Sequence, residues 1–331
     1  MNQQESSIIK WERDRQRPVV ESLFLKITIP DTKLAVWLRY TITKTRSLAH
    51  GALWAVLTDA KETRAVRQAF PMDQVIFSRR RFFLRIGKAK ISTGRAVGEV
   101  ADGQNRLLWD LGFETPAPFF RHFPMDILYR MPFPEVKLVS PYVSTLFYGT
   151  LTLNGSRIEL NGAPGMIGHN WTNKTFPHEW LWIHCNRFKQ GQDTVLEIAA
   201  SRLRPKLPFI AVGFLRTRGQ ETLFNSPLSI LHNRVNRDGD SIRISLQNHE
   251  QRVEATIRNP DLPPVQLCYV APDDSTGLCL NSPGANIQLA LYNEQAYRQG
   301  PYMAIRSDNC TVESMISGTC NDCVLDDRIG R

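Results

Sequence analysis

The sequence of 331 residues has no apolar run long enough to cross a membrane as a helix. Its longest apolar stretches, such as ALWAVL at residues 52–57, fall well below the roughly 20 residues that a bilayer requires. The first 18 residues lack the apolar segment and the small-residue cleavage site of a secretory signal peptide. We therefore expect a soluble, cytoplasmic protein.

The sequence is also poor in cysteine. Its six cysteines are too few for a disulfide scaffold in a chain of this length. Three of them lie near the C-terminus and include one CxxC pair: Cys310, Cys320 and Cys323. They could bind zinc only if a histidine joined them, because strong zinc signatures contain two close pairs. We expect instead free thiols in a loosely structured tail, no metal site, and three small core residues: Cys185, Cys268 and Cys279.

Motifs for cofactor binding and for nucleophilic catalysis are missing. Neither of the glycine-rich phosphate-binding patterns, GxGxxG and GxxxxGKS/T, occurs in the sequence. The GxSxG turn that presents the nucleophile of many hydrolases is absent as well. We therefore expect no cofactor and no activated serine.

Positive charge is in excess, since 41 lysines and arginines face 32 acidic residues and give a net charge of +9. The densest basic run is SRRRFFLRIGKAK at residues 78–90. Basic strands with interleaved aromatic residues can bind single-stranded nucleic acid, but such a run is more often the solvated outer face of a barrel. We expect no nucleic-acid partner. Weak association with an anionic membrane surface stays open, as does the oligomeric state.

Short strand-like segments dominate the sequence, and evidence for helices is thin. Segments such as 21–30, 34–43 and 51–60 alternate apolar and polar residues or contain short apolar runs. The turn NGS at 154–156 separates two further runs and predicts a hairpin. Many short strands joined by hairpins are typical of an all-β sandwich or an up-and-down barrel.

The strand pattern restarts after residue 175, so we predict two consecutive β domains, residues 1–175 and 176–331. Within the first domain, residues 113–141 contain six prolines and many aromatic residues. The prolines exclude a regular sheet throughout this stretch. We expect an extended connection that lies over the surface or across the mouth of a barrel.

Residues 164–188, PGMIGHNWTNKTFPHEWLWIHCNRF, concentrate three tryptophans, three histidines and a glutamate. The part from 179 to 188 is typical of a strand, on which Trp180, Trp182 and His184 share one face. Both faces of this strand are largely apolar, which indicates that it is covered on both sides. We therefore place it at the junction between the two β domains.

A metal site in this segment is not expected. His178 and Glu179 do not continue into HExxH, and His178 and His184 lie six strand positions apart, roughly 20 Å. That separation is too large for two ligands of a single ion. Glu179 immediately precedes Trp180, so we expect its carboxylate to lie in a partly apolar setting.

His169 and Trp171 precede the strand and share a parity across Asn170, so both side chains can project toward the same space. An imidazole and an indole together offer a proton donor or acceptor and a flat apolar wall. The alternative is that both belong to a core in which their ring nitrogens satisfy backbone carbonyls. The residues alone leave both interpretations open.

A longer pattern contains these elements. It runs from Lys-x-x-Ser-Pro at 137–141 through Gly-His-Asn-Trp at 168–171 to Trp-Leu-Trp at 180–182. This pattern resembles the family that contains bacterial carotenoid 1,2-hydratases (hydroxyneurosporene synthases) and the AttH-like proteins. Tocopherol cyclases and fungal decalin-forming Diels–Alderases are more distant relatives. The matching motifs cover roughly residues 130–188.

The resemblance implies two lipocalin-like antiparallel β-barrels in tandem, with a pocket for an apolar ligand at or near their junction. It also implies a cofactor-independent lyase or isomerase that hydrates or cyclises an apolar isoprenoid, polyene or polyketide. The resemblance gives catalytic roles to His169 and Trp171; the family's downstream acidic residue has no clean match, and we take Glu179 or Glu197 as the candidate acid. Four further residues would bind the ligand: Trp180, Trp182, His184 and Asn170.

Two other functions fit the same pattern. Barrels of this size also enclose apolar molecules without changing them, so a carrier of a hydrophobic small molecule is the alternative to an enzyme. In a third interpretation, His169 and the tryptophans only join the two barrels, and loss of His169 would then lower stability rather than turnover.

Overall fold

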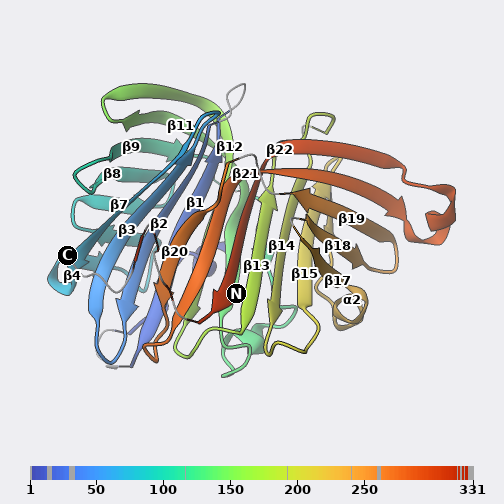
Figure 1. Ribbon diagram of the computed structural model, residues 1–331, viewed down its shortest axis with the longest axis horizontal. Coiled ribbons are helices and arrows are strands. Elements are labelled where there is room, and N and C mark those ends of the chain that lie inside the picture. Colours follow the sequence, from blue (N-terminus) through green and yellow to red (C-terminus); the bar gives the residue numbers. More distant parts are fainter. Residues whose placement is uncertain are drawn as a thin grey trace.

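The computed structural model describes residues 2–12, 17–29, 34–115, 117–191, 193–239, 241–258 and 262–318, together with residues 320, 323, 325 and 326. Two antiparallel sheets dominate this part of the chain, and each curls into a barrel beside the other (Figure 1). The predicted all-β fold of two tandem lipocalin-like barrels is confirmed. No helix among the described residues is long and apolar enough to cross a membrane.

The first sheet has the strand order β4-β3-β2-β1-β12-β11-β9-β8-β7-β6-β5, and β10 pairs with β11 outside this path. Most neighbours are consecutive in sequence and form hairpins, whereas β1 pairs with β12, the last strand of the sheet. The elements of this half are α1 (Gln3–Ser6), β1 (Val19–Thr28), β2 (Ala35–Lys44), β3 (Ala49–Thr58), β4 (Thr63–Pro71), η2 (Met72–Gln74), β5 (Val75–Phe77), β6 (Phe83–Ile86), β7 (Ala89–Ser92), β8 (Arg95–Ala101), β9 (Arg106–Phe113), β10 (Phe120–Arg121), η3 (Asp126–Tyr129), β11 (Lys137–Leu153) and β12 (Ser156–Thr172).

The second sheet has the strand order β16-β15-β14-β13-β22-β21-β19-β18-β17, and β20 pairs with β21 and β23 outside this path. Here the first strand, β13, pairs with β22 near the end of the chain, as β1 pairs with β12 in the first sheet. The elements of this half are β13 (Glu179–Cys185), β14 (Val195–Arg202), β15 (Ile210–Thr217), β16 (Gln220–Leu223), α2 (Pro227–His232), β17 (Arg234–Asp238), β18 (Ser241–Gln247), β19 (Gln251–Arg258), β20 (Val265–Val270), β21 (Thr276–Asn293), η4 (Glu294–Gln299), β22 (Met303–Ser317) and β23 (Leu325–Asp326).

Burial differs between the strands of the first barrel. Strands β1, β2 and β3 are buried on both faces, whereas β9 alternates buried and more exposed positions. One face of β1 directs Leu23 and Leu25 into the core of its own barrel, and the other face directs Phe24 toward the second barrel. Because both faces are covered, these strands have near-continuous apolar runs instead of a simple alternation.

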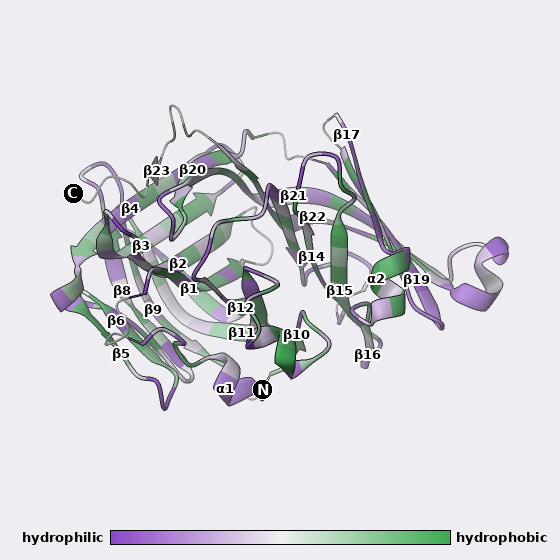
Figure 2. Ribbon diagram, turned by 90° about the horizontal axis from the view of Figure 1, so that it is seen from below, coloured by the Kyte–Doolittle hydropathy of each residue, from purple (hydrophilic) through white to green (hydrophobic). Residues whose placement is uncertain are grey.

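The two barrels meet in a layer that is rich in aromatic side chains. The ring of Phe24 on β1 contacts the ring of Trp182 on β13 edge to face at 5.2 Å, and Trp54 contacts Tyr269 in the same way at 5.7 Å. Figure 2 shows hydrophobic residues along the strands of both barrels. Since β13 also contributes Leu181 and other residues to the core of its own barrel, the predicted cover on both of its faces is confirmed.

The proline-rich stretch 113–141 contains only short regular elements before β11 begins at Lys137. Its short strand β10 lies against the second barrel, where Phe120 packs against Phe214 at 5.5 Å. Asn225 of the second barrel donates a hydrogen bond to the carbonyl oxygen of Arg121 at 2.8 Å. The expected extended connection is therefore present, and it bridges the two barrels.

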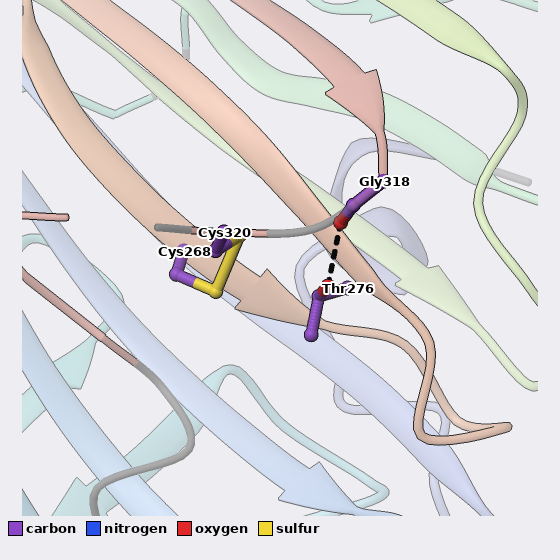
Figure 3. The surroundings of a disulfide bond; sticks show 4 residues. All are labelled: Cys268, Thr276, Gly318 and Cys320. Carbon is purple, nitrogen blue, oxygen red and sulfur yellow. Dashed lines mark hydrogen bonds between the residues drawn. A yellow bond between two sulfur atoms is a disulfide. The ribbon is translucent and has the colours of Figure 1, made fainter. Parts of the chain in front are cut away.

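A disulfide bond joins Cys268 on β20 to Cys320 in the C-terminal segment (Figure 3). Beside it, the hydroxyl of Thr276 donates a hydrogen bond to the carbonyl oxygen of Gly318 at 2.6 Å. The expectation of a loose tail with free thiols is therefore wrong for Cys320, and Cys268 is more than a small core residue. The pairing was not predictable because 52 positions separate the two cysteines in sequence.

The other cysteines occupy three different places. Cys279 is buried on β21 in the layer between the barrels, as expected of a small core residue. Cys310 is buried on β22 beside Cys185 on β13, apart from the disulfide although it precedes Cys320 by only ten positions. The sulfur of Cys323 lies with those of Cys268 and Cys320, all within 4.8 Å of one another. The sequence grouped Cys310 with Cys320 and Cys323, whereas the structure groups Cys268 with Cys320 and Cys323.

Reduction of the Cys268–Cys320 disulfide is expected to lower the free energy of unfolding by about 2–4 kcal/mol, because the bond restricts the unfolded chain between two distant positions. Urea unfolding with and without a reductant measures this difference. In the variant Cys320→Ser, the reductant should have no further effect. An equal effect of the reductant on the variant and on the unmodified protein would refute the assignment.

Candidate functional site at the barrel junction

A buried carboxylate, that of Glu197 on β14, forms the centre of a polar cluster at the junction. Its Oε1 accepts hydrogen bonds from Ser140 Oγ at 2.7 Å and from Trp182 Nε1 at 2.9 Å. His122 Nε2 lies 3.2 Å from the same oxygen, close enough for an ion pair when the imidazole is protonated. His184 lies directly opposite Glu197 on the neighbouring strand β13. All five side chains are buried.

The cluster combines residues of both barrels and of the connection between them. Ser140 belongs to β11 of the first barrel, His122 follows β10, and the other three residues lie on β13 and β14 of the second barrel. The rings of Trp182 and His184 are stacked at 5.9 Å, while His122 packs against Phe120 at 4.2 Å. These groups meet because β13 packs against the first barrel and the connection passes across the junction.

Four polar atoms of this cluster have no hydrogen-bond partner among the described residues: Glu197 Oε2, His122 Nδ1, His122 Nε2 and His184 Nδ1. His122 Nε2 lies near Glu197 Oε1 without the geometry of a hydrogen bond. A buried polar atom without a partner costs about 1–3 kcal/mol and is rare in native proteins. The concentration of such atoms around one carboxylate indicates a place that would hold a water molecule or a polar group of a ligand.

The ionisable groups of the cluster are driven to different protonation states. Burial opposes ionisation of Glu197, but His122 and the hydrogen bond from Ser140 outweigh it, so the pKa of this carboxyl lies below its usual range. Burial and the nearby charge of Lys26 lower the pKa of His184 to about 3. Glu197 is therefore ionised at neutral pH, and His184 is uncharged.

The neutral ring of His184 has a defined orientation. Its Nε2 lies 2.8 Å from the carbonyl oxygen of Val143, which can only accept, so Nε2 carries the proton. The unpartnered Nδ1 then bears a lone pair. The cluster thus contains a base at His184 and a carboxylate at Glu197 that stabilises a proton on His122. Groups whose protonation states differ in this way can carry out acid–base chemistry.

The predicted pair His169 and Trp171 lies elsewhere, inside the end of the first barrel. Their rings are 4.9 Å apart, so they do share one space, as the parity predicted. His169 Nε2 lies 2.8 Å from Glu21 Oε1, and its Nδ1 lies 2.6 Å from the carbonyl oxygen of Ser6. The structure therefore brings His169 to Glu21 and not to Glu197.

The carboxylate of Glu21 also fixes the N-terminal segment. It accepts hydrogen bonds from the backbone N–H groups of Lys10 at 2.6 Å and Trp11 at 2.8 Å. Both Glu21 and His169 are fully buried. Together they join the segment that follows α1 to strands β1 and β12.

Glu179, the other candidate acid, is not brought to Glu197 either. It begins β13, where one carboxylate oxygen lies 2.8 Å from Arg237 and the other lies 3.6 Å from Arg202. The strand separates it from His184 by five positions, about 17 Å. The arginines balance its charge, so Glu179 stabilises one end of the second barrel.

The four predicted ligand-binding residues are spread along the junction. Trp182 and His184 belong to the Glu197 cluster, as described above. Trp180 is half-buried against the aromatic layer on the same face of β13. Asn170 lies on β12 opposite Leu138 of β11, and it is half-buried.

Sequence reasoning missed His122, Ser140 and Glu21. Glu21 gave a usable signal, because it is the one charged residue on the inward parity of β1, with Leu23 and Leu25 following on the same face. Such a residue predicts a buried partner. His122 gave none, since it stands between phenylalanines in a proline-rich connection without a periodic pattern.

Two antiparallel barrels in tandem, with β13 buried between them, define a class of double-barrel proteins. The chain belongs to the tocopherol cyclase-like family, whose model matches residues 142–315. This agrees with the resemblance that the motifs of residues 130–188 indicated. Among curated proteins, no sequence matches the chain.

Solved structures share the fold over nearly the whole chain. An AttH protein from Nitrosomonas europaea is 14% identical, with a TM-score of 0.56 over 93% of this chain and 96% of that one. CghA is 10% identical, with a TM-score of 0.57 over 92% and 90%. Kievitone hydratase from Nectria haematococca is 9% identical, with a TM-score of 0.53 over 96% of both chains. At these identities the likeness establishes the fold alone.

Proposed function

We propose that this protein is a cofactor-independent enzyme that hydrates or cyclises an apolar isoprenoid, polyene or polyketide at the barrel junction. One observation carries the proposal: a buried carboxylate and two buried histidines converge on unpartnered polar atoms within an aromatic layer. Membership of the tocopherol cyclase-like family supports it, as does the fold shared with a protein named a hydratase.

In the proposed reaction, His122 donates a proton to an electron-rich double bond. The C–H bond that forms leaves a carbocation at the neighbouring carbon. The ring of Trp182 stabilises this cation through its π face, and the Glu197 carboxylate stabilises it through its negative charge. Glu197 thus holds and orients the acid, in place of being the acid itself.

The carbocation can react further in two ways. In a hydration, a water molecule attacks it and loses one proton to Nδ1 of His184, so that the net change is the addition of water. In a cyclisation, a second double bond attacks, and His184 removes the proton that restores a double bond. Both outcomes use the same residues, and the shape of the ligand selects between them.

The carrier alternative leads to a different experimental result. An organic extract of the native host cells would be incubated with the protein in water enriched in oxygen-18 or deuterium, and the lipids would be compared by mass spectrometry. The proposal expects a new product with oxygen-18 for a hydration or deuterium for a proton-initiated cyclisation. A ligand that is bound and recovered unchanged, without label, would support the carrier and contradict the enzyme.

A further inference from the structure

A cavity of about 400 Å³ lies at the end of the first barrel. Three segments line it: the chain around Lys10 and Val19, the connection from Tyr129 to Lys137, and the end of β12 from Trp171 to Lys174. Its volume is in the range of small-molecule pockets. None of the residues of the Glu197 cluster lines it, so it is a separate site.

The lining is strongly cationic. It contains two carboxylates, those of Glu12 and Glu135, and five basic side chains: Lys10, Arg17, Arg130, Lys137 and Lys174. Glu12 lies 2.7 Å from Arg79, outside this set, so its charge is already balanced. Among the described residues, Arg17, Arg130 and Lys174 form no ion pair. An excess of positive charge without internal partners favours an anionic ligand.

Lys137 is a buried ammonium group in this lining. Its Nζ donates hydrogen bonds to the carbonyl oxygens of Leu128 at 2.5 Å and Met131 at 3.0 Å. An ammonium group has three protons, so one proton has no oxygen acceptor among the described residues; the ring of Phe123 lies 5.7 Å from Nζ. Burial and the neighbouring charge of Lys174 lower the pKa of Lys137 to about 8. An anion beside these two lysines would offset their repulsion.

Aromatic side chains supply the apolar part of the cavity. The rings of Tyr129 and Trp171 are 6.0 Å apart and inclined by only 30°. The Nζ of Lys10 lies 5.7 Å from the centroid of the Trp171 ring. The two rings already contact each other, so a flat group would lie against them on the cavity side, with its charged end beside the basic residues.

We propose that this cavity binds a small molecule that carries an anionic group on a flat aromatic or conjugated body. The site is independent of the acid–base cluster at the junction. The basic side chains of the lining, with Arg130 and Lys174 as its basic rim, bind the anion. Trp171 and Tyr129 contact the body of the ligand. Trp171 is then a ligand-binding residue, whereas the sequence assigned it a catalytic role.

Two fluorescent probes with the same aromatic skeleton test the proposal: anilinonaphthalene sulfonate, which is anionic, and phenylnaphthylamine, which is neutral. The folded protein should bind the sulfonate at least about tenfold more tightly, because charge-assisted contacts form only with that probe. The double variant Arg130→Gln/Lys174→Gln should abolish most of this preference. The matched control Lys88→Gln/Arg157→Gln removes two exposed positive charges elsewhere and should retain it.

The pH dependence of sulfonate binding provides a second measurement. Lys137 is protonated below about pH 8, so affinity should be highest there and should fall as the pH rises through 8 to 9. The variant Lys137→Met should lose most of this dependence, as the probe does not titrate in that range. Lys10, whose pKa burial also lowers, lines the same cavity, so Lys10→Met serves as the comparison variant. Equal affinity for both probes, or equal losses in the rim and control variants, would overturn the proposal. Glu197→Gln should leave sulfonate binding unchanged, which separates this test from that of the proposed enzyme.

Discussion

Replacement of Glu197 by glutamine is expected to reduce turnover by about 10²- to 10⁴-fold, the range over which a positioned acid contributes to rate. The side chains are equal in size, and the amide oxygen can still accept from Ser140 Oγ and Trp182 Nε1. The change removes the negative charge that stabilises a proton on His122. The measurement is the rate of product formation, with thermal unfolding as a check that the barrels remain intact.

Glu179→Gln is the matched control for this variant. Glu179 is also a buried carboxylate on the same pair of strands, but its charge is balanced by Arg237 and Arg202. Its replacement should lower stability and leave the rate per folded molecule unchanged. Should Glu179→Gln abolish turnover while Glu197→Gln retains it, the assignment of the junction cluster would be refuted.

The position of β13 could be predicted because this strand has apolar side chains on both of its faces. That property requires cover on both faces, and it is visible without any knowledge of the partner. Trp182 and His184 were correctly placed at the junction for this reason. Glu197 lies beside them because β14 pairs with β13 in a register that places Glu197 directly opposite His184.

The remainder of the cluster depends on contacts that no local pattern encodes. His122 reaches Glu197 through an irregular connection, and Ser140 reaches it from the other barrel. For His169, the parity correctly paired it with Trp171. It could not reveal that both lie inside the first barrel, because the partner, Glu21, is 148 positions away in sequence.

His169→Ala is expected to lower the free energy of unfolding by about 3–5 kcal/mol, because it leaves the carboxylate of Glu21 buried without the imidazole that faces it. Both ring nitrogens of His169 are already engaged, with Glu21 and with the carbonyl of Ser6. Loss of the ring should therefore release the N-terminal segment while the junction cluster keeps its geometry. Urea unfolding measures the stability, and the rate per folded molecule measures catalysis.

A double-mutant cycle with Glu21→Gln distinguishes this explanation from simple loss of packing. Lys10 N–H and Trp11 N–H donate to different oxygens of Glu21, so glutamine keeps an acceptor for one of them and carries no charge. The cost of Glu21→Gln alone is therefore measured as the reference of the cycle. In that background, His169→Ala should cost much less, because no uncompensated carboxylate remains. The exposed His249 serves as a control, and His249→Ala should have no effect on stability. If His169→Ala kept full stability and lost turnover, His169 would act in the chemistry, and the separation between the two histidine sites would be wrong.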